Sequence, residues 1–169
     1  MKKKSLLLVL LAVVFANGTL FAQKKNTLFG GNIIVGFPTG SFGDSYTSAI
    51  GFEGMGGIGL GENIYAIASL GYVSYAAESY NPYGRVTLIP IKAGLRYYAT
   101  KNLFLAGNAG VGFIKDQTLN SRESRFAYDV GAGVQFSMFQ AGLYYDGWKR
   151  QNTSGSSNSI LLKFGIAIK

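Results

Sequence analysis

Residues Arg125 to Phe136 alternate between two kinds of side chain. Even positions from Phe126 onward are apolar or aromatic, and odd positions are charged, polar or small. Successive side chains of a β-strand point to opposite faces, whereas a helix of period 3.6 would not separate the two sets. Tilted by about 40°, ten such residues rise about 25 Å, the height of the apolar band of an outer-membrane barrel. The stretch therefore predicts a two-faced strand long enough to span a membrane.

The rest of the chain repeats this unit. Eight strands are predicted, at 28–37, 50–60, 64–75, 86–99, 103–114, 125–136, 139–148 and 159–169. Tight turns are expected at 61–63, 100–102 and 137–138, and longer polar loops at 38–48, 76–85, 115–124 and 149–158. Short turns on one rim and longer loops on the other are typical of outer-membrane barrels. The pattern predicts an all-β fold, an eight-stranded antiparallel up-and-down transmembrane β-barrel, with both chain ends on the short-turn, periplasmic side.

Composition and the first residues agree with export to a membrane. Only 14% of the residues are charged, against about 25% in a usual soluble domain, so much of the surface is not expected to face water. The N-terminus is typical of an export signal, with lysines at 2–4, an apolar run at 6–16 and Ala22 before the expected cleavage site. The apolar run is shorter than the roughly 20 residues of a spanning helix. We predict a cleaved signal peptide, 1–22, followed by one barrel domain, 23–169.

A central hairpin carries a resemblance to a known family. Residues 89–98 and 103–113, joined by Thr100-Lys101-Asn102, combine glycines, aromatic residues and alternation. They resemble the central hairpin of the outer-membrane β-barrel domain family, the small eight-stranded, OmpX-type barrels of Gram-negative envelopes. Pro90 departs from a simple strand because it cannot donate to the ladder, and a bulge is expected there.

The resemblance implies a location and a set of partners. It implies a monomer in the outer membrane of a Gram-negative bacterium, surrounded by outer-membrane lipid and lipopolysaccharide. Residues 163–169 resemble the strand signal that the barrel assembly machinery recognises, although Lys169 stands where an aromatic or apolar residue is usual. Many members of the family have no known activity, and the resemblance implies none here.

Two barrels fit such strands, one with its apolar face toward lipid and one with its apolar face toward a soluble core, as in lipocalin-like binders. The polar face carries small residues where a soluble surface would carry Lys, Glu and Thr, and a narrow lumen needs small residues. These residues are Asn108, Gly110, Gly112, Gly131, Gly133 and Gly165. Aromatic residues lie near both ends of the apolar face, as in the girdles of membrane barrels. They are Phe37, Phe113, Phe126, Tyr128 and Tyr145 toward the loops, and Tyr97, Phe136 and Phe139 toward the turns. We therefore expect the apolar face to meet lipid.

Counting with period 2 sends six charged side chains inward. They are the acids Glu53, Asp129 and Asp146 and the bases Lys92, Arg96 and Lys163. Isolated buried charges are expensive, so we expect these six to pair with one another as a lumen charge network. The functional alternatives are a proton or ion path and a carboxylate pair in acid–base catalysis.

No catalytic, cofactor-binding or metal site is predicted. The chain has neither histidine nor cysteine, which excludes a Ser-His-Asp arrangement, a histidine metal site and thiol chemistry. The run 54–59 is rich in glycine but lacks the lysine and helix of a phosphate loop. The formal net charge of +8 suggests nucleic acid, but an exported chain rarely meets it, and no basic cluster with interleaved aromatics is present.

The loops remain as the place for function. Four aromatic residues in or beside them are expected either to contact a partner or to lie at the lipid headgroups: Tyr46, Tyr80, Tyr83 and Trp148. We predict a non-enzymatic outer-membrane protein with a structural or surface-interaction role, such as envelope integrity, adhesion or resistance to host factors. Two alternatives stay open: a soluble secreted lipocalin-like lipid carrier, and a small porin-like channel.

Overall fold

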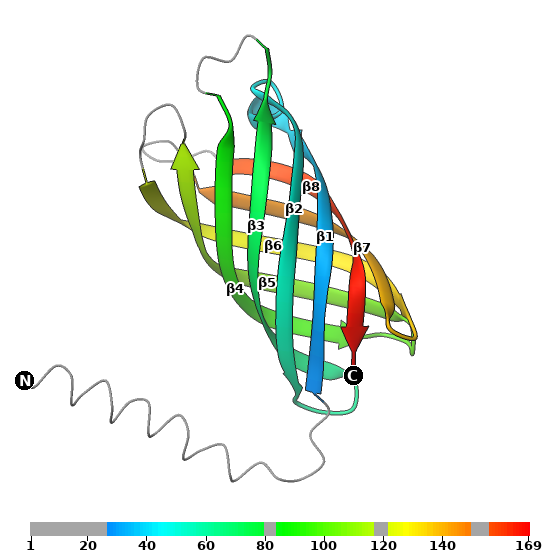
Figure 1. The fold of residues 1–169 in the computed structure, drawn as a ribbon. Coiled ribbons are helices and arrows are strands. Elements are labelled where there is room, and N and C mark those ends of the chain that lie inside the picture. The colour runs from blue at the N-terminus through cyan, green and yellow to red at the C-terminus, as the bar shows by residue number, and fades with distance from the viewer. Residues whose placement is uncertain (1–26, 80–83, 117–121, 150–155) are drawn as a thin grey trace, which may run out of the picture.

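Eight antiparallel strands close into one barrel (Figure 1). The structure, a computed structural model, describes residues 27–79, 84–116, 122–149 and 156–169. The predicted signal peptide, 1–22, lies outside these residues. Each strand pairs with the next, and β8 closes the barrel against β1. The elements are β1 (Thr27–Thr39), η2 (Gly40–Phe42), β2 (Tyr46–Gly59), β3 (Ile64–Ala77), β4 (Val86–Tyr98), β5 (Leu103–Asp116), β6 (Arg122–Phe136), β7 (Phe139–Lys149) and β8 (Ser156–Ile168). The predicted fold class is confirmed.

The wall of the barrel has the two faces that the alternation predicts. Along β6, Phe126, Val130 and Val134 point outward and are exposed, whereas Ala127 and Asp129 point inward and are buried. The other strands alternate in the same way. Their outward face carries large apolar side chains, and their buried inward face carries the charged residues of the predicted network together with apolar ones such as Leu88 and Leu161. No helix in the described part of the chain is long and apolar enough to cross a membrane.

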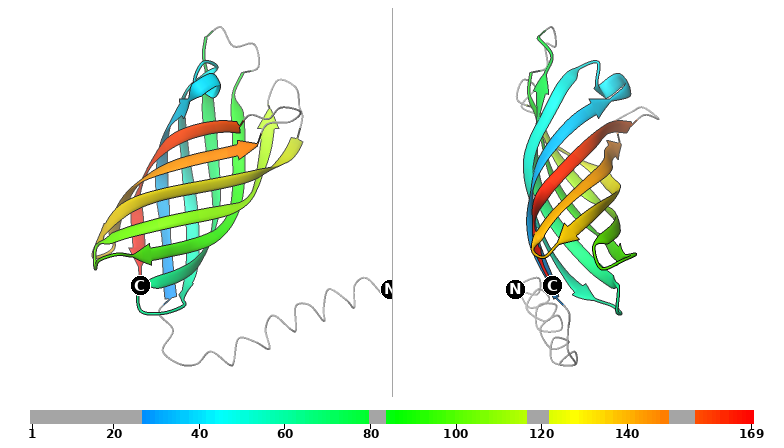
Figure 2. Two further views of the ribbon diagram at one scale, coloured as in Figure 1. Left: turned by 180° about the vertical axis from the view of Figure 1, so that it is seen from behind. Right: turned by 90° about the vertical axis from the view of Figure 1, so that its right-hand side faces the viewer.

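The two rims differ as expected. Tight turns join β2 to β3, β4 to β5 and β6 to β7 at one rim, which we call the turn rim. β1 begins and β8 ends at this rim, since Phe29 pairs with Ile168 (Figures 1 and 2). The opposite rim, the loop rim, carries η2 and the other connections. There the strands continue further than predicted, so that β2 begins at Tyr46 and β8 at Ser156.

The bulge lies elsewhere than predicted. β3 pairs with β4 in one constant register, with Leu70 opposite Ile91 and Val73 opposite Leu88, so no extra residue is inserted at Pro90. The pyrrolidine ring of Pro90 instead has room because Gly71 lies opposite it. A Cβ on Gly71 would lie only 3.3 Å from Pro90 Cγ. The expected bulge at Pro90 is therefore wrong.

A register shift does occur at the start of β2. Tyr46 pairs with Ala77 and Ser48 with Ala76, which leaves Thr47 as the extra residue. A bulge of this kind reverses the face on which the preceding residues point. Tyr46 and Ala49 are both buried in the lumen as a result, although an odd number of positions separates them.

Candidate functional site in the lumen

All six charged residues of the predicted lumen charge network point into the barrel. Only 1–7% of the surface of each is exposed. Five different strands carry them, because each sits at an inward position of its own strand's alternation. They are Glu53 (β2), Lys92 and Arg96 (β4), Asp129 (β6), Asp146 (β7) and Lys163 (β8), and each of these strands contributes one residue to an ion pair.

Lys92 holds two carboxylates together. Asp129 and Asp146 are opposite each other on β6 and β7, so their like charges would repel without a cation between them. Lys92 Nζ forms an ion pair with Asp129 and lies 2.7 Å from Asp146 Oδ1. Asn108 Nδ2 donates to Asp129 Oδ1 at 2.6 Å. This cluster joins β4, β5, β6 and β7.

Lys163 extends the cluster to the other side of the lumen. Its Nζ lies 2.9 Å from Glu53 Oε2 and 3.6 Å from Asp129 Oδ2. It also stands over the ring of Tyr144, 4.3 Å from the centroid. Lys163 therefore couples β8 with β2 and β6, and it gives Glu53 a direct countercharge.

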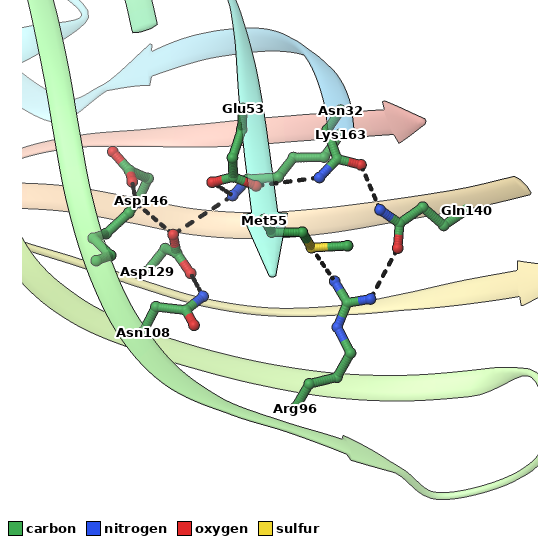
Figure 3. A network of polar contacts seen from close by, with 10 residues as sticks. Asn32, Glu53, Met55, Arg96, Asn108, Asp129, Gln140, Asp146 and Lys163 are labelled. Carbon is green, nitrogen blue, oxygen red and sulfur yellow. Dashed lines mark hydrogen bonds and ion pairs between the residues drawn. The ribbon is translucent and has the colours of Figure 1, made fainter. Parts of the chain in front are cut away.

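Arg96 reaches the acids only through neutral amides. Its Nη1 donates to Gln140 Oε1 at 2.9 Å, and its guanidinium lies over the ring of Phe104 at 4.1 Å. Gln140 Nε2 donates to Asn32 Oδ1 at 2.8 Å, and Asn32 Nδ2 donates to Glu53 Oε1 at 3.1 Å (Figure 3). The expectation of direct pairing is therefore wrong for Arg96, whose positive charge is linked to Glu53 by two amides in series.

The network is balanced in charge, and its contacts connect opposite sides of the lumen. Three acids face three bases, and with the amides included it takes side chains from every strand except β3. Hydrogen-bond chains of this kind polarise one another in a medium of low dielectric, so a complete network is more stable than its separate pairs. The amides Asn32 and Gln140 were not predicted as members. Counting with period 2 would have placed both amides on the inward face. An amide there can bridge a cation and an anion, because it both donates and accepts a hydrogen bond.

An aromatic plug closes the lumen at the loop rim. Phe42, on the short helix η2, has its ring centroid 4.6 Å from that of Tyr46, 5.1 Å from Tyr75 and 5.0 Å from Trp148. All four rings are buried. We call these four residues the aromatic plug.

Two of the four predicted loop contacts thus lie inside the barrel. Tyr46 turns inward because of the bulge at Thr47, and Trp148 because β7 continues its alternation beyond Asp146. Neither is placed to contact a partner or the lipid headgroups. Tyr80 and Tyr83 lie outside the described residues.

The lumen is also filled at the turn rim. The Tyr98 hydroxyl donates to Gln135 Oε1 at 2.5 Å, and the Tyr98 ring packs near Phe104. Lys169 Nζ stands over the Tyr98 ring, 3.7 Å from its centroid. Partial burial, and secondarily the nearby charge of Arg96, lower the pKa of Lys169. Packed side chains therefore occupy both ends and the middle of the lumen.

In the described part of the chain, the side chains of the lumen form ion pairs, hydrogen bonds and packing contacts. Each inward carboxylate contacts a cation or an amide, and hydroxyl groups have no histidine as a base in this chain. Among the residues that the structure describes, no three metal-ligating side chains come together.

The fold is that of small outer-membrane β-barrels. No protein-family model and no curated protein sequence matches the chain. The solved structure of Neisserial surface protein A is 15% identical, and the match covers 87% of this chain and 99% of that one with a TM-score of 0.59. Ail of Yersinia pestis, solved with the heparin analogue sucrose octasulfate, is 18% identical, with 85% and 97% covered and a TM-score of 0.53. A de novo designed transmembrane β-barrel is 15% identical, with 86% and 98% covered and a TM-score of 0.51.

These likenesses establish the fold and no activity. The identities are low, and a designed barrel matches to a similar degree as two natural surface proteins. The predicted resemblance to OmpX-type barrels is confirmed at the level of the fold.

Proposed function

We propose that this chain is an integral protein of the Gram-negative outer membrane, whose filled barrel is an anchor and whose loop rim interacts with other molecules at the cell surface. One observation carries the proposal, the reversed distribution of its side chains. Ile50 and Phe139 are each 66% exposed on the outside, whereas Arg96 is 1% exposed inside. In water each outward apolar side chain would forgo about 1.5–3 kcal/mol of burial, so a lipid solvent accounts for this surface.

The same distribution disfavours the soluble lipid carrier. A lipocalin-like binder needs an apolar cavity inside the barrel and a polar surface outside. Here the middle of the lumen holds the lumen charge network, with three acids and three bases, and the aromatic plug fills the loop-rim end. A lipid ligand would have to displace the ion pairs of Lys92 and Lys163.

The filled lumen also favours an anchor over a channel. A small eight-stranded barrel is just wide enough for side chains to fill. The ion pairs of Lys92 and Lys163 lie across its middle, and the rings of Phe42 and Trp148 pack across the loop-rim end. An ion would have to break several of these contacts to pass.

A surface role through the loops follows by elimination and gains support from the comparisons. The described part of the loop rim exposes the cations Arg85, Lys115 and Lys149. Two of the similar folds belong to proteins named for attachment and invasion and for the Neisserial surface. Adhesion, resistance to host factors and envelope integrity are the roles that such a rim suits. Membrane lipid and lipopolysaccharide around a monomer, and the barrel assembly machinery during insertion, complete the proposed partners.

Three measurements test this proposal in sequence. The full chain is expected in the outer-membrane fraction, extractable only with detergent, and its folded form should migrate differently from the boiled form on a gel. Planar-bilayer recording of the pure protein should give no stable conductance steps. A variant with residues 79–83, 117–121 and 150–155 replaced by Gly-Ser linkers should keep both properties and lose surface binding to host cells or serum components. A monomer extracted in plain buffer, or stable conductance steps, would refute the corresponding part.

A further inference from the structure

A groove of about 480 Å³ runs along the outside of β2 and β3 beneath the loop rim. Its depth follows from the pairing of the two strands, since Ser48 lies beside Ala76 at the top and Phe52 beside Tyr72 four residues deeper. At about 3.3 Å per residue this is a span of about 13 Å. The groove opens onto the outward face, which in the proposed function meets the lipid.

The chemistry of the groove changes along its length. At the deep end Phe52 and Tyr72 stack, with ring centroids 5.6 Å apart and planes at 15°. At the top Ser48, Ala76 and the exposed Arg85 line the groove, and between the two ends Ser74 lies opposite Ile50. The bulge at Thr47 lies at the same level, where Thr47 Oγ1 donates to the Ala76 carbonyl at 3.3 Å. The groove is therefore apolar at its deep end and carries a positive charge at the end near the loop rim.

A second hollow continues the apolar path toward the turn rim. It measures about 810 Å³, shares Phe52 and Tyr72 with the groove, and is lined beyond them by Gly54, Gly56 and Ala68. These small residues leave the outer wall thin between larger neighbours. An alkyl chain that passes the stacked rings would find further apolar surface there.

We propose that the groove binds one anionic membrane lipid, with its phosphate at Arg85 and an acyl chain along the wall to the Phe52–Tyr72 stack. The planar guanidinium of arginine matches a phosphate in two parallel hydrogen bonds. Ser48 lies beside Ala76 at about the level of Arg85, and Ser74 lies two residues deeper, where its hydroxyl group can meet the polar linkage between a phosphate and an acyl chain. This inference rests on the proposed function, because it needs the outer wall to lie in lipid.

A second copy of the chain fits the groove less well. A two-fold contact centred on this surface would use the same patch on both subunits. Two Arg85 guanidinium groups would then approach each other at a low-dielectric contact, and like charges there repel. A phosphate supplies the opposite charge, and the apolar depth suits a chain that ends in methylene groups.

Native mass spectrometry of the folded protein released from detergent tests the inference. The probes are dimyristoylphosphatidylglycerol, which is anionic, dimyristoylphosphatidylcholine, which is zwitterionic, and sn-glycerol 3-phosphate, which lacks acyl chains. We expect the wild type to retain one molecule of the anionic lipid preferentially. Arg85→Ala should weaken that binding about tenfold, as the loss of one charge-assisted contact does. Lys149→Ala, which removes an exposed cation on β7 instead, should not.

Filling the groove tests the acyl part separately. Ala76→Phe and Ser74→Phe should each weaken binding of both lipids, and the shift of the folded band on heating shows for each variant whether the barrel has formed. The inference is overturned if Arg85→Ala loses no more affinity for the anionic lipid than Lys149→Ala does. It is also overturned if the groove-filling variants fold and still bind lipid as the wild type does, or if glycerol 3-phosphate binds as well as the lipid. A lipid-free dimer that Ala76→Phe dissociates would overturn it too.

Failure of the two proposals can be told apart. A wild-type chain that stays in plain buffer and shows no heat-dependent migration contradicts the membrane location and the lipid groove together. A chain that inserts into vesicles but binds anionic lipid independently of Arg85 contradicts the groove alone.

Discussion

The inside and the outside of the barrel wall are built from the same strands, yet they constrain the sequence in different ways. On β4, Lys92 points inward into contact with two carboxylates, and its neighbour Ile91 points outward with no polar partner to satisfy. An inward residue must match particular atoms in charge and shape, whereas an outward residue must chiefly be apolar. Substitutions should therefore be costly inside and tolerated outside, and the predictions below test that contrast.

The largest effect is expected at Lys92. Lys92→Met leaves Asp129 and Asp146 side by side without their shared cation. Removing one partner of a buried ion pair costs about 3–5 kcal/mol. Here Asp146 is left buried without a direct countercharge, whereas Asp129 keeps Lys163 at 3.6 Å. Equilibrium urea unfolding in detergent micelles measures the loss. The matched outward variant Ile91→Met should cost less than about 1.5 kcal/mol, because it conserves volume and polarity.

A second variant separates loss of charge balance from loss of packing. Lys92→Met combined with Asp146→Asn removes one base and one acid, so the double variant should be more stable than the sum of the two single effects predicts. If Lys92→Met and Ile91→Met lower the free energy of unfolding equally, the lumen charge network does not stabilise the barrel.

Glycines on the two faces give the next largest contrast. A Cβ on Gly133, which faces the lumen, would overlap the ring of Phe104 and the carbonyl of Ala141. A Cβ on the outward Gly107 would meet nothing within 4 Å. Gly133→Ala should therefore cost about 1–3 kcal/mol by overpacking. Gly107→Ala should be neutral or stabilise by up to about 1 kcal/mol through the unfolded chain, as measured by the same urea unfolding. Equal costs at both positions would contradict the contrast.

Gly147 is an outward position where the contrast should break. The Tyr128 side chain crosses it, and its hydroxyl donates to Asn158 Oδ1 at 3.1 Å. A Cβ on Gly147 would lie 2.5 Å from Asn158 Oδ1 and 2.7 Å from that hydroxyl oxygen. Gly147→Ala should displace the tyrosine and cost about 1 kcal/mol, the value of one such hydrogen bond. In a Tyr128→Ala background the hydrogen bond is already lost and the Asn158 side chain is free to turn away, so the same substitution should cost less. An unchanged cost there would mean that the tyrosine is not the cause.

The strand pattern could be predicted from the sequence because alternation reports directly on the two faces. Strands β3 and β6 begin and end close to the predicted positions, and all six inward charges were identified by counting with period 2. The pattern fails wherever a residue is inserted. The bulge at Thr47 leaves no compositional trace, so Tyr46 was expected near the loops although it lies inside.

Contacts across the barrel are the second limit. Phe42 lies in what the sequence presents as a polar loop, and only the closed fold brings it between Tyr75 and Trp148. The link from Arg96 through Gln140 to Asn32 joins strands that are far apart in the chain, at 108 residues for the last pair. Alternation predicts on which face a residue lies, but not which residue it meets there. Likewise, Pro90 is accommodated by Gly71 across the ladder, a pairing that depends on register.

Single cysteines should have the smallest effect on stability. They give the sharpest test of which face meets lipid, since the chain has no cysteine of its own. Ala106 and Ala109 lie on the same strand, β5, the first buried in the lumen and the second exposed on the outside. Replacing alanine by cysteine adds one sulfur atom, so both variants should fold. In vesicles, Ala109→Cys should react with a lipid-soluble maleimide and resist a charged one, whereas Ala106→Cys should resist both. In urea both should be labelled fully, which controls for thiol oxidation. Rapid labelling of Ala106→Cys by the charged reagent would mean that water reaches the middle of the lumen. The barrel would then be a channel and not a filled anchor, and the inward side chains would no longer need the close matching on which the contrast between the faces depends.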